Sequence, residues 1–157
     1  MAKKDIDWNN LGFGYVKTDK RYVSNFKDGA WDDGALIDDD MITISECACV
    51  LQYAQTVFEG LKAYTTEDGR VVCFRPDLNA SRLADSASRL EMPVFPEDRF
   101  VDAIAKVVEA NIDYVPPYVL VQHCIFVLIC LVVMPSLVLN LPMSISSEYL
   151  QHLRTLL

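Results

Sequence analysis

Alternating polar and apolar positions mark the first part of the chain as strand-rich. Between residues 12 and 23, aromatic and β-branched residues stand between polar ones, a pattern typical of a strand. Runs of Gly and Asp follow, and we predict two short strands among them, at Ala35–Ile37 and at residues 41–44. The next segment, SECACVLQYAQTVFEG (residues 45–60), is consistent with a short helix.

The clearest hairpin lies in the segment LKAYTTEDGRVVCF (residues 61–74). Asp68-Gly69 stands between two strand-like runs, and Gly tolerates the positive φ that a tight turn requires. We therefore predict two antiparallel strands joined at this dipeptide.

Two helices are predicted after the hairpin. Pro76 supplies a fixed φ at the start of the first helix, and Pro93 ends it. Pro96 opens the second helix with an acidic first turn, which suits the helix dipole. The apolar residues at helical spacing are Ala80, Leu83, Ala84, Ala87 and Leu90, then Phe100, Ile104, Val107 and Val108. Because strands come first and both helices follow, we predict an α+β fold with two layers, a mainly antiparallel sheet with helices on one face.

Charge is distributed unevenly along the 157 residues, whose formal net charge is -8. Residues 1–118 carry 13 Lys+Arg and 21 Asp+Glu, whereas the last 39 residues carry only Glu148 and Arg154. The acidic part lacks the Lys and Arg cluster that phosphate-backbone binding needs, so we expect no nucleic-acid partner. Chemistry on a small molecule fits this composition better.

The cysteine and histidine positions give no support to a metal site or a redox motif. The five cysteines include no CxxC pair, and Cys47 and Cys49 are too close for an ordinary disulfide. Both histidines lie in the last 39 residues, so no zinc-ligand pattern is formed and we expect no metal site. The first ten residues lack the apolar core of a signal peptide, and we expect a cytoplasmic location.

Arg82 and Arg89 are the first candidates for chemistry. They lie seven residues apart on the first predicted helix and share roughly one face. An Arg near the first turns of a helix can hold a phosphate or a carboxylate bidentately. Spacing alone favours a different interpretation, in which Arg82 forms a surface pair with Asp85, three residues on.

Aromatic side chains and one lysine are the other candidates. Phe13, Tyr53 and Phe58 could line an apolar pocket, although aromatic residues are more often simple core. Lys62 raises the possibility of a Schiff base with an aldehyde cofactor, but no catalytic partner accompanies it, so a solvated lysine is the safer assignment. The sequence gives no evidence that Glu59 and Glu67 act as an acid–base pair.

Four motifs together resemble the branched-chain-amino-acid aminotransferases, the class IV enzymes that use pyridoxal 5'-phosphate. The motifs are FGYVKTD (residues 13–19), FEGLKAY (58–64), FRPDLNASRL (74–83) and RLEMPVFPEDRF (89–100). The resemblance covers about residues 11–118. It implies that residues 1–118 form the N-terminal small domain of that family.

The resemblance also implies roles for particular residues. Arg82, the Arg of FRPxLNxxR, matches the position that binds the cofactor phosphate, which reverses the preference for a surface pair. Phe13, Tyr53 and Phe58 match positions that wall the pocket for the aliphatic substrate side chain. No catalytic residue is implied in this chain, because the family's Schiff-base lysine belongs to a large C-terminal domain that the chain lacks.

The implied reaction is reversible amino transfer between Leu, Ile or Val and 2-oxoglutarate, with branched-chain amino acids and 2-oxo acids as the small-molecule partners. Members of the family are homodimers, and a homodimer is implied here. Without the lysine, the isolated chain is expected to be an inactive fragment.

Residues 119–157 form an apolar tail that the resemblance does not cover, and it has three interpretations. The unbroken apolar run, residues 124–134, is 11 residues long, whereas a helix that crosses a membrane needs about 20. A membrane anchor is therefore disfavoured. A divergent element that packs on the small domain leaves unexplained why the similarity ends abruptly after VPPY (residues 115–118).

A shift of the reading frame after Tyr118 is the interpretation that we favour. If one G is restored after the Tyr118 codon, the codons of the tail permit the string GTGATLYFRP. In the family, VPPY is typically followed by a sequence like GTGASLYIRP. The alternative function is a non-catalytic fragment that acts as a membrane-tethered or partner-binding module.

Overall fold

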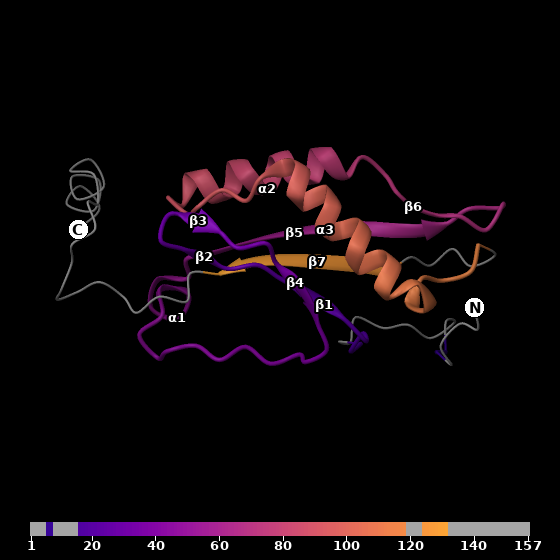
Figure 1. The fold of residues 1–157 in the computed structure, drawn as a ribbon. Coiled ribbons are helices and arrows are strands. Elements are labelled where there is room, and N and C mark those ends of the chain that lie inside the picture. The colour runs from indigo at the N-terminus through magenta and orange to yellow at the C-terminus, as the bar shows by residue number, and fades with distance from the viewer. Residues whose placement is uncertain (1–5, 8–15, 119–123, 132–157) are drawn as a thin grey trace.

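A computed structural model describes residues 6–7 and 16–118, and the backbone of residues 124–131 (Figure 1). The first four strands form two nested hairpins: β1 (Arg21–Val23) pairs antiparallel with β4 (Ala35–Ile37), and β2 (Phe26–Lys27) pairs with β3 (Ala30–Trp31). The inner hairpin turns at Asp28 and Gly29, whose φ angles of 53° and 83° fit a tight two-residue turn.

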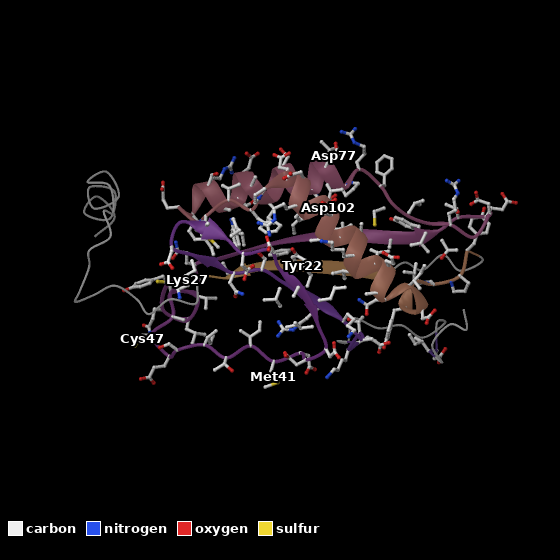
Figure 2. All side chains as sticks on the ribbon, in the orientation of Figure 1. Tyr22, Lys27, Met41, Cys47, Asp77 and Asp102 are labelled. Carbon is white, nitrogen blue, oxygen red and sulfur yellow. The ribbon has the colours of Figure 1, made fainter. Side chains whose placement is uncertain are left out.

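The strand predictions in this region are partly confirmed. Ala35–Ile37 is a strand as predicted, and the described part of residues 12–23 is a strand only from Arg21 to Val23. The prediction for residues 41–44 is wrong, because they form no strand. Arg21 instead donates through Nη2 to the carbonyl of Met41 at 2.6 Å, and the Met41 side chain is exposed. Figure 2 shows Met41 and Cys47 along this loop, on the far side of the sheet from the helices.

The central sheet has three strands in the order β6-β5-β7, all antiparallel to their neighbours. Its middle strand is β5 (Thr56–Thr65), which follows the short helix α1 (Cys49–Tyr53). The predicted hairpin is confirmed, since β5 pairs with β6 (Val71–Cys73) and Gly69 has a φ of 81° in the connection. The short helix is also confirmed, although residues 56–60 belong to β5 rather than to the helix.

The third strand of this sheet comes from the apolar tail. The backbone of β7 (Cys124–Leu131) pairs with β5 from Thr56↔Leu131 to Ala63↔Cys124. β7 therefore runs along most of β5, whereas β6 pairs only with its last three residues, 63–65.

Helices α2 (Pro76–Arg89) and α3 (Glu97–Ala110) lie on one face of the central sheet, and a 3-10 helix, η2 (Ile112–Tyr114), follows them (Figure 1). Pro76 occupies the start of α2 as predicted, and Pro96 precedes α3. The apolar residues predicted at helical spacing, which form one stripe on each helix, supply the core. Ala80, Leu83, Ala87, Phe100, Ile104 and Val108 are buried, while Leu90 is exposed. The two-layer α+β fold is confirmed.

Residues of β5 alternate between the helices and the opposite face of the sheet. Val57, Leu61 and Ala63 are buried in one core with the stripes of α2 and α3. Phe58, Gly60 and Tyr64 alternate with the buried positions and are exposed, whereas Glu59 is buried. This period of two gives β5 one face that holds the fold together and one open face.

Asn111, at the end of α3, ties the first strand region to the helices. Its side chain is 1% exposed, donates to the carbonyls of Lys20 and Val107 at 2.9 Å each, and accepts from the Lys20 N–H at 3.0 Å. All of these groups would lose a partner if Asn111 were truncated, so it fixes where β1 begins relative to α3.

Within the described residues, no helix is both long enough and apolar enough to cross a membrane. The described residues also hold no group of three or more Asp, Glu, His or Cys side chains placed to bind a metal ion.

We predict different effects on stability when a buried and an exposed phenylalanine are replaced by alanine. Phe100→Ala is expected to lower the free energy of unfolding by about 3–5 kcal/mol, because the side chain is 1% exposed and its removal leaves a cavity. Phe74→Ala is the matched control, since Phe74 is 82% exposed, and it should change stability by less than about 0.5 kcal/mol. Urea denaturation of both variants measures this, and similar losses would contradict the assignment of the core.

Candidate functional site

The candidate site is built where β5 meets the first turns of α2. Glu59 lies on β5 between Val57 and Leu61, in the register that faces the helices, and its side chain is only 10% exposed. A carboxylate on this buried face needs hydrogen-bond and charge partners. Asn79 and Arg82 provide them from α2, where a spacing of three residues puts both on the same side of the helix.

Hydrogen bonds from α2 hold both oxygens of the Glu59 carboxylate. Arg82 donates from Nη2 to Oε1 at 2.7 Å and from Nε to Oε2 at 3.1 Å. Asn79 donates from Nδ2 to Oε1 at 2.9 Å and also to the carbonyl of Gly60 at 3.1 Å. The pair is thus a bidentate ion pair supported by an amide, and it fastens α2 to β5.

This arrangement keeps the carboxylate ionised. Burial raises the pKa of Glu59, but hydrogen bonds from Arg82 and Asn79, together with the Arg82 charge, outweigh burial and leave the pKa below its ordinary value. The same contact with Glu59 raises the pKa of the Arg82 guanidinium, so both members of the pair are charged at neutral pH.

Arg82 remains accessible although it is paired. Its side chain is 62% exposed, and Nη1 donates to none of the described residues. The ion pair is with Glu59 and not with Asp85, so the interpretation of Arg82 as half of a local surface pair is wrong. A fixed guanidinium with free N–H groups at the surface can bind an anion such as a phosphate.

A shallow pocket of about 220 Å³ adjoins this cluster. Its lining includes Asn79 from α2, Phe74 before that helix, and Gly60, Lys62 and Tyr64 from β5. Lys62 lies within β5 and is partly buried. The pocket therefore combines two aromatic walls with a lysine and an amide beside the ion pair.

The three aromatic residues predicted for a substrate pocket have different outcomes. Tyr53, at the end of α1, is 64% exposed, and Phe58, on the open face of β5, is 76% exposed. Neither is simple core. Phe13 lies outside the described residues.

Glu59 and Asn79 are the site residues that the sequence argument missed. The sequence could have identified Glu59, because the alternation of residues 57–63 places it on the buried face of the strand. A charged residue in that register indicates a partner nearby, and Asn79 and Arg82, three residues apart, face the same way.

Comparisons with known proteins agree on the part of the chain that is related to them. No protein-family model matches the chain. The branched-chain-amino-acid aminotransferase of Haemophilus influenzae is 50% identical over 115 residues, which is 73% of this chain and 34% of that enzyme. Branched-chain-amino-acid transaminase 1 of Bacillus subtilis is 40% identical over 115 residues, 32% of its length. A methionine aminotransferase of Arabidopsis thaliana is 44% identical over 114 residues, again 32% of its length.

Solved structures show the same fold. The branched-chain aminotransferase of Thermoproteus uzoniensis with norvaline matches 77% of this chain and 37% of its own with a TM-score of 0.54 and 20% identity. A second branched-chain amino acid aminotransferase, complexed with N-(5'-phosphopyridoxyl)-L-glutamate, matches 74% of this chain and 34% of its own with a TM-score of 0.56 and 24% identity.

The chain spans about one third of the length of the curated relatives that it matches. Over about 73% of its length the chain is similar in sequence to branched-chain-amino-acid aminotransferases, at up to 50% identity, and its fold matches part of two solved branched-chain aminotransferases.

Proposed function

We propose that this chain supplies the cofactor-phosphate contact and part of the substrate pocket of a branched-chain-amino-acid aminotransferase that uses pyridoxal 5'-phosphate. The observation that carries the proposal is Arg82: it stands in FRPDLNASRL with its guanidinium held by Glu59 and still largely exposed. The whole enzyme would exchange amino groups between Leu, Ile or Val and 2-oxoglutarate.

The described residues fit a phosphate in chemistry and in access. A phosphate needs strong, oriented donors, and Arg82 offers the N–H groups that Glu59 leaves unused. Because Glu59 and Arg82 are formally neutral together, an anion must bind through these donors and cannot depend on net charge alone. When bound, the cofactor would act as the electron sink for amino transfer.

The proposed substrate pocket uses the open face of β5. Tyr53 and Phe58 expose large rigid rings on two consecutive elements, α1 and β5, and Phe13 is proposed to join them. Such rings favour aliphatic side chains, because contact removes apolar surface from water on both sides. A methionine aminotransferase among the relatives is compatible with a pocket that accepts unbranched as well as branched chains.

We propose that residues 119–157 are read one base out of frame. The match to the Haemophilus influenzae relative comprises 115 residues, which is about the length of residues 1–118. In the restored frame, Leu-Tyr-Phe-Arg-Pro would stand at residues 124–128, within the segment whose backbone forms β7. The whole protein, with its frame restored, is proposed to act as a cytoplasmic homodimer, as the family resemblance implies.

The first prediction concerns the phosphate contact. Arg82→Ala should weaken binding of pyridoxine 5'-phosphate to the chain by about tenfold, because one charge-assisted contact is lost. This ligand is an alcohol and cannot condense with lysines, so it reports on binding alone. Binding of pyridoxine, which lacks the phosphate, should not change. Calorimetric titration measures both, and equal binding of pyridoxine 5'-phosphate by the variant and the unchanged chain would refute the contact.

The second prediction concerns activity and the gene. The 157-residue chain should form no glutamate from leucine and 2-oxoglutarate, whereas the gene with one G restored after the Tyr118 codon should encode an active enzyme. Sequencing across that codon tests the premise directly. Turnover by the 157-residue chain, or a downstream frame that encodes an unrelated sequence, would defeat the proposal.

The third prediction follows from the lowered pKa of Glu59. A carboxylate with a folded pKa below its ordinary 4.5 stabilises the fold fully above that value, and the contribution is lost as the pH falls through the folded pKa. The stability difference between the unchanged chain and Glu59→Gln should therefore be constant above about pH 6 and shift against the unchanged chain below 4.5. Urea denaturation across pH measures it, and a difference that does not vary with pH would contradict the pairing. Other carboxylates titrate in both proteins and cancel.

A further inference from the structure

We propose that Glu59 is a positioning residue which, together with Asn79, fixes the Arg82 guanidinium so that its remaining N–H groups face an incoming phosphate. The inference rests on the proposed function and deepens it. It names the residues that orient the proposed contact, and it assigns a role to a carboxylate beside an anion site.

The geometry of the carboxylate supports this role. Oε1 of Glu59 accepts from Arg82 Nη2, from Asn79 Nδ2 and from the Gly60 N–H, at 2.7, 2.9 and 3.1 Å. Oε2 accepts from Arg82 Nε at 3.1 Å. Because Arg82 donates from two nitrogens to two oxygens, the plane of its guanidinium is fixed, and rotation would break both bonds. The Nη1 edge then lies away from Glu59, on a side chain that is 62% exposed.

Asn79 makes the support rigid. It is 8% exposed and joins Glu59 Oε1 to the backbone carbonyl of Gly60, so the carboxylate is held by β5 and α2 together. A long arginine side chain that is already ordered loses less conformational entropy when it binds an anion.

The negative charge of Glu59 and its orienting of Arg82 have opposite effects on phosphate binding, and this makes the positioning role testable. If Glu59 acted only through its negative charge, it would repel a phosphate, and its removal would strengthen binding. If Glu59 acts by orienting Arg82, truncation weakens binding. Glutamine helps to separate the effects, because it removes the charge and keeps Oε1, which accepts three of the four hydrogen bonds, while its amide nitrogen replaces Oε2 and ends the bond from Arg82 Nε.

The experiment measures the affinity of the 157-residue chain for pyridoxine 5'-phosphate, together with the nuclear magnetic resonance signal of the Arg82 Nε–H. Glu59→Ala should weaken binding by about tenfold and move the Nε–H signal toward that of a free arginine. Glu59→Gln should bind less tightly than the unchanged chain and more tightly than Glu59→Ala, because it keeps the bond from Arg82 Nη2 and loses the bond from Nε. Asp77→Asn is the matched control, since Asp77 pairs with Arg75 at 2.7 Å on the exposed start of the same helix, and it should change neither quantity (Figure 2).

Each other outcome is decisive. Tighter binding by both Glu59 variants would show that the carboxylate only repels the anion. Equal weakening in both, with pyridoxine binding reduced as well, would show a general structural role, and either result overturns the inference. If Arg82→Ala loses binding while Glu59→Ala keeps it, only the positioning role fails. If Arg82→Ala binds like the unchanged chain, or the unchanged chain shows no binding, the proposed function fails and this inference with it.

Asn79→Ala provides a second variant in case Glu59→Ala does not fold. Loss of Asn79 removes one of the three donors to Oε1 and the link from Oε1 to the Gly60 carbonyl, but it leaves the Glu59–Arg82 pair in place. Weaker binding is therefore expected, with a smaller change in the Nε–H signal than in Glu59→Ala. Unchanged affinity in a folded Asn79→Ala chain would count against the positioning role.

Discussion

A buried carboxylate, Glu59, is the constraint on which the candidate site depends. Side chains of β5 alternate between the two faces of the sheet, so the residue at position 59, two residues from both Val57 and Leu61, faces α2 whatever its chemistry. Placing a negative charge there is unfavourable unless donors surround it. Asn79 and Arg82, in the first turns of α2, donate hydrogen bonds to the carboxylate, and these bonds align the helix against the strand. The fold and the candidate site thus share one interaction.

The two faces of β5 have different roles in the domain. One face, with the stripes of α2 and α3, buries the apolar surface that stabilises the structure. The other face leaves Phe58 and Tyr64 exposed, and Phe74 lies exposed beyond β6. Large exposed aromatic side chains on one face are typical of an interaction surface.

Turn and proline signals, together with the helical spacing of apolar residues, predicted most of the fold, because they report directly on where an element begins and which of its sides is buried. The helices from Pro76 and after Pro96, the hairpin at Asp68-Gly69 and the strand Ala35–Ile37 were all recoverable in this way. Residues 41–44 have a strand-like composition, but the backbone there is held by the Arg21 side chain, and a contact between residues so far apart leaves no local signal. The partner of Arg82 was missed for a related reason. Asp85 is near in sequence, whereas Glu59 is near only after β5 and α2 have packed.

The role of β7 follows from what a sheet edge requires. Pairing along β5 uses backbone N–H and C=O groups, which every residue but proline carries, and side chains affect it mainly through β-branched and aromatic preference. The segment CIFVLICL, residues 124–131, is rich in such residues and can complete the sheet whatever its origin. If residues 119–157 are read out of frame, as proposed, the segment keeps its strand pairing although its side chains differ from those of the restored frame. The restored frame would bring a tyrosine and an arginine to positions 125 and 127, where Ile125 and Val127 now stand. The backbone pairing of β7 with β5 does not depend on those side chains, so an ordered sheet is compatible with either reading frame.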